Sequence, residues 1–193
     1  MPSGLASFAP ERASEGRGSL LKQHTGVMTA SMPRGFRSAE GARTARPAAT
    51  GPWGAAPSPI RGSAAQKAGL RYERKVLDML VEALPGFQRS PWFTFEDRRG
   101  PRWCQPDGLL PEPLILFEVK IRTTPLAWWQ LSSLYRPVVE LVFKRRVEGL
   151  VMVCRSFDPS IPMPTPVRHL LRLSVKEIIA TPGETLAVYS WRP

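Results

Sequence analysis

The sequence predicts one α/β domain that follows a basic N-terminal arm. Residues 1–65 are rich in Ala, Gly, Ser, Pro and Arg and have no sustained hydrophobic period. Residues 66–193 contain successive runs with the periods of helices and strands, and a hydrophobic fraction of 42% over 193 residues is enough for one core. Within the domain we expect a core over 66–155 and a C-terminal extension over 156–193.

The arm combines an excess of positive charge with few apolar residues. Its first 60 residues hold seven Lys or Arg and three Glu. Such a segment cannot bury enough apolar surface to offset the entropy lost on ordering, so we expect it to be disordered. Three explanations remain open: a non-specific nucleic-acid arm, a translation start upstream of the true one (Met28 and Met32 lie downstream), or an organellar transit peptide.

Order is expected to begin with a helix in "QKAGLRYERKVLDMLVEAL" that ends at Pro85-Gly86. The apolar positions at helical spacing are Leu70, Leu77, Leu80, Val81 and Leu84. Glu73 falls on the same face, where a carboxylate is costly unless something pairs with it. The alternative is a Glu favoured by the helix macrodipole, with Arg or Lys nearby.

Three strand-like runs follow, over 91–97, 101–110 and 114–121, joined by short polar or Pro/Gly turns. A second helix is then predicted, with Thr124 as N-cap and Pro125 at its first position. We expect Pro137 to end or kink this helix.

The remaining chain predicts three more elements. "GLVMVCRSF" is typical of a buried strand, "LSVKEIIA" of a short helix and "TLAVYSW" of a last strand. The core order is therefore helix, three strands, helix, strand (αβββαβ), with a short helix and a strand after it.

Charge and composition indicate the kind of partner. Lys and Arg total 27 against 16 acidic residues, a net charge of +11, and the pI is near 10.6. This favours an acidic polymer, most often nucleic acid, although solubility or a biased genome would also give a basic protein. We expect no membrane span, no secretory signal, and an intracellular, cytoplasmic location, with virion association compatible.

One strand carries two charges where apolar residues are expected. Glu118 and Lys120 share a face of the run 114–121, and Asp107 can return beside them across the "PEP" turn. Two carboxylates held close together repel unless a cation lies between them, and Mg²⁺ takes oxygen ligands. The alternatives are turn chemistry for Pro-Asp-Gly and a simple ion pair for Glu-x-Lys.

This set suits metal-assisted hydrolysis of a phosphodiester. The metal would polarise the phosphoryl group and lower the pKa of an attacking water. Lys120 could position or deprotonate that water, or stabilise developing charge. We expect burial and the cation to lower the pKa of Lys120, which would aid the role of base.

"QPDG", nine residues and "EVK" resemble the signature of the PD-(D/E)XK nuclease superfamily, with Asp107, Glu118 and Lys120 in its three positions. The superfamily core has the same αβββαβ order, and its resolvase-like and phage-exonuclease-like members carry a Glu on the first helix. The resemblance implies Glu73 as a further metal- or water-holding carboxylate. It also implies Gln130 as the Gln of the second helix; the family's Gln-to-Tyr spacing is four and here it is five, so Tyr135 is not carried over.

The predicted function is Mg²⁺-dependent cleavage of DNA by an enzyme of endonuclease type, with Mn²⁺ as a substitute for Mg²⁺. Phosphate contacts are expected from Arg71, Arg122, Lys144 and Arg145. The alternative is a non-catalytic DNA-binding or structural nucleoprotein or virion component with the same fold and a basic arm. A homodimer or a phage or other DNA-processing assembly is compatible with either function.

Overall fold

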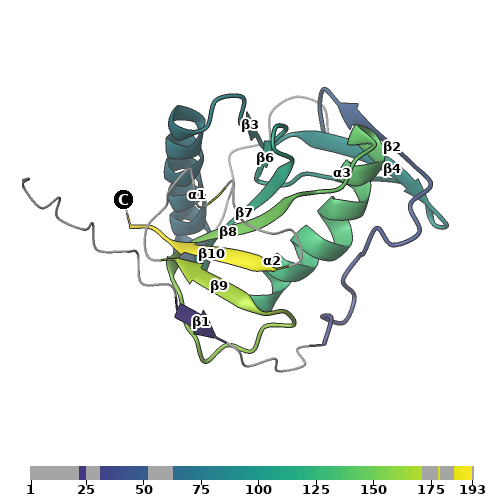
Figure 1. Cartoon of the computed structure of the whole chain (residues 1–193). Helices are drawn as coiled ribbons and strands as arrows, with labels where there is room; N and C mark the ends of the chain where they lie inside the picture. Colours follow the sequence, from purple (N-terminus) through teal and green to yellow (C-terminus); the bar gives the residue numbers. More distant parts are fainter. Residues whose placement is uncertain (1–21, 25–30, 52–62, 171–177, 179–184, 193) are drawn as a thin grey trace, which may run out of the picture.

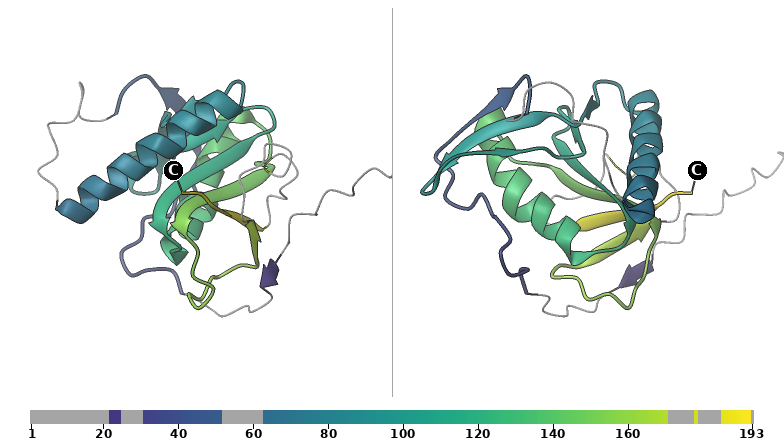
Figure 2. Two further views of the ribbon diagram at one scale, coloured as in Figure 1. Left: turned by 90° about the vertical axis from the view of Figure 1, so that its left-hand side faces the viewer. Right: turned by 180° about the vertical axis from the view of Figure 1, so that it is seen from behind.

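The computed structural model describes residues 22–24, 31–51, 63–170, 178 and 185–192. They form a mixed α/β structure with two sheets and two helical units, one on each side of the larger sheet (Figures 1 and 2). None of the helices in these ranges is long and apolar enough to cross a bilayer.

The larger sheet has seven strands in the order β1-β9-β10-β8-β7-β6-β3. Their bounds are β1 (Lys22–His24), β3 (Gln88–Arg89), β6 (Gly108–Leu110), β7 (Ile115–Arg122), β8 (Gly149–Ser156), β9 (Val167–Leu170) and β10 (Leu186–Ser190). The four strands β7, β8, β10 and β9 run parallel, whereas β6 and β3 continue the sheet antiparallel on one side and β1 on the other.

The smaller sheet is antiparallel and has the order β2-β4-β5. Its strands are β2 (Thr44–Ala48), β4 (Trp92–Asp97) and β5 (Gly100–Cys104). Figure 1 and the right-hand view of Figure 2 place this sheet beside α3, on the opposite side of the molecule from α1. The predicted first two strands therefore lie mainly outside the large sheet, and the run 101–110 divides into β5 and β6.

Helix α1 (Ala64–Ala83) begins at a capping box in which Ser63 and Gln66 exchange hydrogen bonds. Its buried positions are Tyr72, Val76, Leu77 and Leu80, which pack on one face of the large sheet. The predicted apolar face is wrong at two positions, because Leu70 and Val81 are 41% and 49% exposed. The helix is rotated about its axis relative to the prediction, so that Tyr72 and Val76 face the sheet instead. Helical spacing alone does not determine this rotation.

The second helical unit covers the other face of the sheet and runs without interruption through α2 (Pro125–Trp129), η1 (Gln130–Tyr135) and α3 (Arg136–Phe143). The predicted cap is confirmed, since the Thr124 side chain accepts from the backbone N–H of Leu126. Pro137 does not end the helix. The helical hydrogen-bond pattern changes just before Pro137, where the π-helical segment η1 directly precedes α3.

Pro137 explains how part of the N-terminal segment is held. A proline lacks the N–H that would bond to the carbonyl four residues earlier, which here is that of Ser133. The backbone N–H of Ala39 donates to this carbonyl at 2.7 Å, and Ala39 is fully buried. The prediction of disorder through residue 65 is therefore wrong for 31–51, where β2 also pairs with β4.

Two further predictions are confirmed in the C-terminal part. The run 149–157 forms the buried strand β8, and the last predicted strand corresponds to β10. The expected short helix over 173–180 falls outside the described residues except for the buried Ile178. Strand β9 was not predicted; it extends the large sheet within the C-terminal extension.

Candidate active site

The hairpin of β6 and β7 brings Asp107 to the middle of β7. Gly108 pairs with Phe117 and Leu110 with Ile115, so Asp107 precedes β6 at the level of Glu118. The backbone N–H of Val119 donates to Asp107 Oδ2 at 2.7 Å, and the carbonyl of Asp107 accepts from the N–H of Ser90 at 2.9 Å. These bonds fix the carboxyl group beside β7, as the sequence predicted.

Gly108 has a packing role in the same motif. A Cβ atom at this position would lie 2.2 Å from the ring of Phe87, closer than any real contact. Phe87 in turn meets Phe117 edge-on, with ring centroids 5.2 Å apart. The glycine of "PDG" therefore lets the backbone next to Asp107 approach an aromatic pair in the core.

Glu118 and Lys120 lie on the face of β7 that carries Leu114 and Leu116, toward the second helical unit. Glu118 is only 1% exposed, and its Oε1 is ion-paired with the Lys120 ammonium group. Its Oε2 is buried and has no hydrogen-bond partner among the described residues. A buried carboxylate oxygen left in this way normally has a partner that is a cation or a donor.

The carboxyl groups of the site resist ionisation together. Burial, then the charge of Asp107, raise the pKa of Glu118 to about 8, against the lowering effect of Lys120. Burial also raises the pKa of Asp107, although the charge of Lys120, the Val119 N–H and the neighbouring Glu118 carboxyl group lower this pKa in part. One ammonium group does not neutralise several carboxylates, so the site favours an additional cation or a proton.

Lys120 differs from the expectation in one respect. Burial acts to lower its pKa, but the carboxylates of Glu118, Asp107 and Glu73 outweigh burial and raise the pKa above the usual value. Among these neighbours Lys120 stays an ammonium group at neutral pH. The arrangement therefore suits stabilisation of negative charge more than removal of a proton.

Glu73 reaches the same charge cluster from α1. It lines a cleft of about 380 Å³ together with Gln66, Gly69, Leu70, Val119, Lys120 and Ile121. Burial and then the charge of Asp107 raise the pKa of Glu73, while Lys120 and Arg89 lower it. Arg89 is a nearby cation that the sequence did not single out; it is also paired with Asp78 at 2.6 Å on the surface.

Gln130 and Tyr135 come together through the π-helical segment. The Gln130 amide donates to Tyr135 Oη at 3.2 Å, and burial, followed by the charges of Glu118 and Asp107, raises the pKa of Tyr135. Hydrogen bonds in a π-helix join residues five apart, so each turn is wider than in an α-helix, and within η1 the side chains of Gln130 and Tyr135 meet. The spacing that excluded Tyr135 at the sequence level is thus accommodated by η1, and Tyr135 lies within electrostatic range of the acidic pair.

The donor set fits a hard divalent cation at two side chains. Asp107 and Glu118 supply carboxylate oxygens, one of them buried without a partner, and Mg²⁺ is usually bound by one or two carboxylates with waters completing its shell. Within the described part of the chain, no group of three or more His, Cys, Asp or Glu side chains is arranged to hold a metal. The metal-ligand role expected for Glu73 stays a prediction; the structure gives its electrostatic coupling to Asp107 and Lys120.

The four predicted phosphate-binding residues fall into two groups. Arg71 on α1 and Arg122 at the end of β7 are exposed, on the elements that carry Glu73 and Lys120. Lys144 and Arg145 follow α3 at the other end of β7, where Arg145 pairs with Glu112 and bonds to the Pro111 carbonyl. Arg145 holds the turn before β7, so the structure removes it, with its neighbour Lys144, from the surroundings of the acidic pair.

Comparison of the chain with protein-family models, with curated proteins and with solved structures finds no match.

The raised pKa values predict how stability changes with pH. A carboxyl group whose pKa is higher in the folded than in the unfolded state binds more protons when folded, so its contribution is present at low pH and is lost as pH rises. The stability that Glu118 contributes is lost as pH rises from its ordinary pKa of 4.5 to its raised pKa of about 8. The raised pKa values of Asp107 and Glu73 act in the same direction.

Urea unfolding in EDTA, measured from about pH 5 to about pH 9, should show this decline in wild type and a smaller one in Glu118→Gln. A decline of the same size in both proteins would contradict the assigned pKa of Glu118.

Proposed function

We propose that the chain is a Mg²⁺-dependent nuclease that hydrolyses DNA phosphodiester bonds. Asp107 and Glu118 hold the cation, and Lys120 faces the phosphate under attack. The observation that carries the proposal is the buried Glu118, with one oxygen on Lys120, the other without a partner, and Asp107 fixed beside it. The spacing of these residues also resembles the PD-(D/E)XK nuclease superfamily.

Each residue has a role that follows from its surroundings. A bound Mg²⁺ supplies Lewis acidity toward the phosphoryl oxygens and lowers the pKa of a water. Asp107 is oriented by the Val119 N–H, so its carboxylate is fixed before substrate arrives. Lys120, kept protonated by its neighbours, stabilises the negative charge that develops on the phosphate oxygens and orients the attacking water.

The ion pair between Lys120 and Glu118 also has a consequence for binding. Glu118 would hold the cation with the oxygen that has no partner in the described chain, while Lys120, ion-paired with the other oxygen, would be available to a phosphate beside it. The local excess of carboxylates over Lys120 favours a divalent cation. Arg122 and Arg71, exposed on the flanking elements, and the net charge of +11 supply the attraction for DNA.

The proposal is tested by incubating the protein with plasmid, linear and branched DNA in the presence of Mg²⁺ or Mn²⁺. Wild type is expected to cut at least one of these substrates, and Asp107→Ala to lose the activity. Circular dichroism checks that both proteins are folded. Folded wild type that cuts no substrate, or Asp107→Ala that cuts as wild type does, would contradict the proposal.

A second function is a DNA-binding component that does not cut. The observation in its favour is that the described residues offer two acidic side chains for a metal and no group of three. This function would be supported if the protein cuts no DNA but binds it with an affinity that falls with salt, does not depend on Mg²⁺ and is unchanged in Asp107→Ala.

A further inference from the structure

The smaller sheet has one face that nothing in the described chain covers. Pairing places Phe93 opposite Cys104 and Phe95 opposite Arg102, and this side packs toward α3 and the core. Because side chains alternate along a strand, the other face carries Thr94 and Trp103 with the residues that pair beside them. The outward row across the sheet is Arg46, Thr94 and Trp103.

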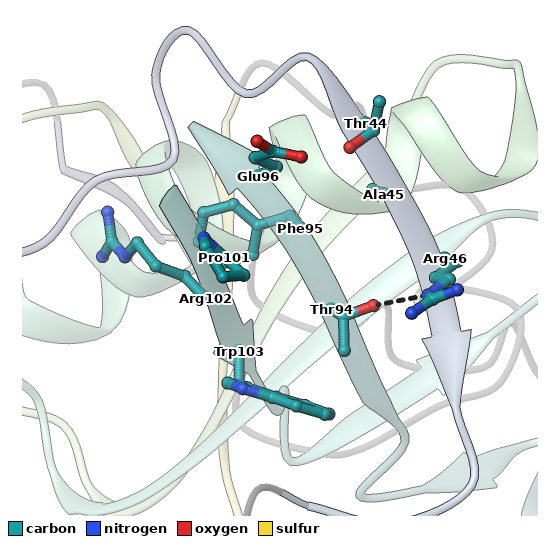
Figure 3. Close-up of a pocket in the computed structure, with 9 residues that line it drawn as sticks. All are labelled: Thr44, Ala45, Arg46, Thr94, Phe95, Glu96, Pro101, Arg102 and Trp103. Atoms are coloured by element: carbon teal, nitrogen blue, oxygen red, sulfur yellow. Dashed lines mark hydrogen bonds between the residues drawn. The ribbon is translucent and has the colours of Figure 1, made fainter. Parts of the chain in front are cut away.

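This outward face is hollowed and carries an exposed indole. A hollow of about 430 Å³ is lined by residues of all three strands, among them Arg46, Thr94 and Trp103. Figure 3 shows Trp103 and Arg46 on either side of Thr94, to whose hydroxyl the Arg46 Nε donates at 3.3 Å. Trp103 is 42% exposed, so the face of its indole ring is available to a partner.

Basic side chains lie in the hollow and near it. Arg46 lines it from β2, whereas Arg98 and Arg99, exposed at the turn between β4 and β5, line a second hollow that shares Arg102 with the first. Asp97 is engaged on the inner side by Arg102 at 2.5 Å, which leaves Glu96 as the acidic side chain of the outward face. An aromatic ring among arginines matches a nucleic acid, whose bases stack on the ring and whose phosphates meet the guanidinium groups.

The same sheet is attached directly to the acidic pair. Only two residues, Gln105 and Pro106, separate the end of β5 at Cys104 from Asp107, so Trp103 and Asp107 are at most about 14 Å apart along the chain. The connection is braced, because the Gln105 amide donates to the Ser90 carbonyl at 2.9 Å while the Ser90 N–H donates to Asp107. Trp103 on the outward face is therefore close enough to Asp107 for one bound strand of nucleic acid to reach both.

We propose that the outward face of β2, β4 and β5 binds a single-stranded segment of the substrate next to the cleaved bond. An unpaired base stacks on Trp103, and the adjoining phosphates contact Arg46 and the arginines of the β4–β5 turn. A single strand fits better than a duplex, because base pairs stacked within a duplex offer no free face to the indole. This inference rests on the proposed function and adds the kind of substrate: DNA with an unpaired segment.

The test is a binding assay in EDTA, where no cleavage occurs, by fluorescence anisotropy with a blunt duplex and with the same duplex carrying a single-stranded tail. Trp103→Ala is expected to bind the tailed DNA about tenfold more weakly and the blunt duplex as wild type does. Trp103→Phe should restore most of the affinity. Val81→Ala, at an exposed apolar residue on α1, is the matched control and should change neither.

Arg46→Ala gives an independent result. It should weaken binding of the tailed DNA and reduce the slope of log affinity against log salt by about one, whereas Lys75→Ala on α1 should leave the tail preference unchanged. Unchanged binding of tailed DNA by both Trp103→Ala and Arg46→Ala would overturn the inference. So would a loss of self-association in Trp103→Ala without any change in DNA binding, since this would assign the face to a second copy of the chain.

The two proposals fail in different ways. If wild type never cuts DNA but Trp103→Ala loses the preference for the tail, the nuclease function fails and the binding face stands. If Asp107→Ala abolishes cleavage while the hollow variants bind tailed DNA as wild type does, the nuclease function stands and the binding face is wrong.

Discussion

Replacing Lys120 by alanine is expected to lower the rate of DNA cleavage by about 10³-fold. The ammonium group is held by buried carboxylates at the position where negative charge would develop, and no other cation is ion-paired with Glu118 within the described residues. Single-turnover cleavage at saturating Mg²⁺ measures the effect. Affinity for DNA should change little, because the chain keeps its other 26 Lys and Arg residues.

Lys75→Ala is the matched control for this variant. Lys75 is an exposed lysine of α1, and its removal takes away the same charge without touching the acidic pair. We expect it to cut at nearly the rate of wild type. A loss of similar size in both variants would show that Lys120 acts only through the overall charge.

Neighbouring residues of β7 are expected to separate function from stability. Glu118→Gln keeps the shape of the side chain but removes a charge that would bind the cation, so cleavage should fall by about 10²-fold or more. Its free energy of unfolding in EDTA at about pH 8 should equal or exceed that of wild type, since the ionised carboxylate is unfavourable where it is buried.

Phe117→Ala should lower stability first, in contrast to Glu118→Gln, whose main effect is on cleavage. Phe117 is fully buried on the other face of β7, against Phe87 and the residues of α1. Removing the ring is expected to lower the free energy of unfolding by about 3–5 kcal/mol. Urea unfolding and cleavage rates of the two variants are compared directly. Equal losses of stability would contradict the view that Glu118 is placed for function.

The acidic hairpin could be predicted because its signals are local. Alternation along 114–121 fixes which side chains share a face, and a short turn returns Asp107 to them. The structure has this hairpin. What the sequence could not supply is the electrostatic balance: Lys120 was expected to have a lowered pKa, and its direction depends on how many carboxylates gather around it.

Features that depend on distant contacts were missed. Residues 31–51 carry weak local signals, and they are ordered by pairing of β2 with β4 and by the carbonyl that Pro137 leaves without a helical donor. The π-helical segment is likewise invisible in the pattern, although it decides that Gln130 meets Tyr135. Arg145 was expected to contact phosphate because it lies in a basic run after a helix, but in the structure it binds Glu112 in a turn of its own chain.

The cleavage rate measured against Mg²⁺ concentration tests whether Asp107 and Glu118 bind the proposed cation. Wild type should be inactive in EDTA and reach a plateau as Mg²⁺ rises, and Asp107→Asn should need at least about tenfold more Mg²⁺ or show no cleavage at all. The same rate in EDTA as in Mg²⁺, or the same Mg²⁺ dependence in both proteins, would contradict the assignment of these two carboxylates as the metal site.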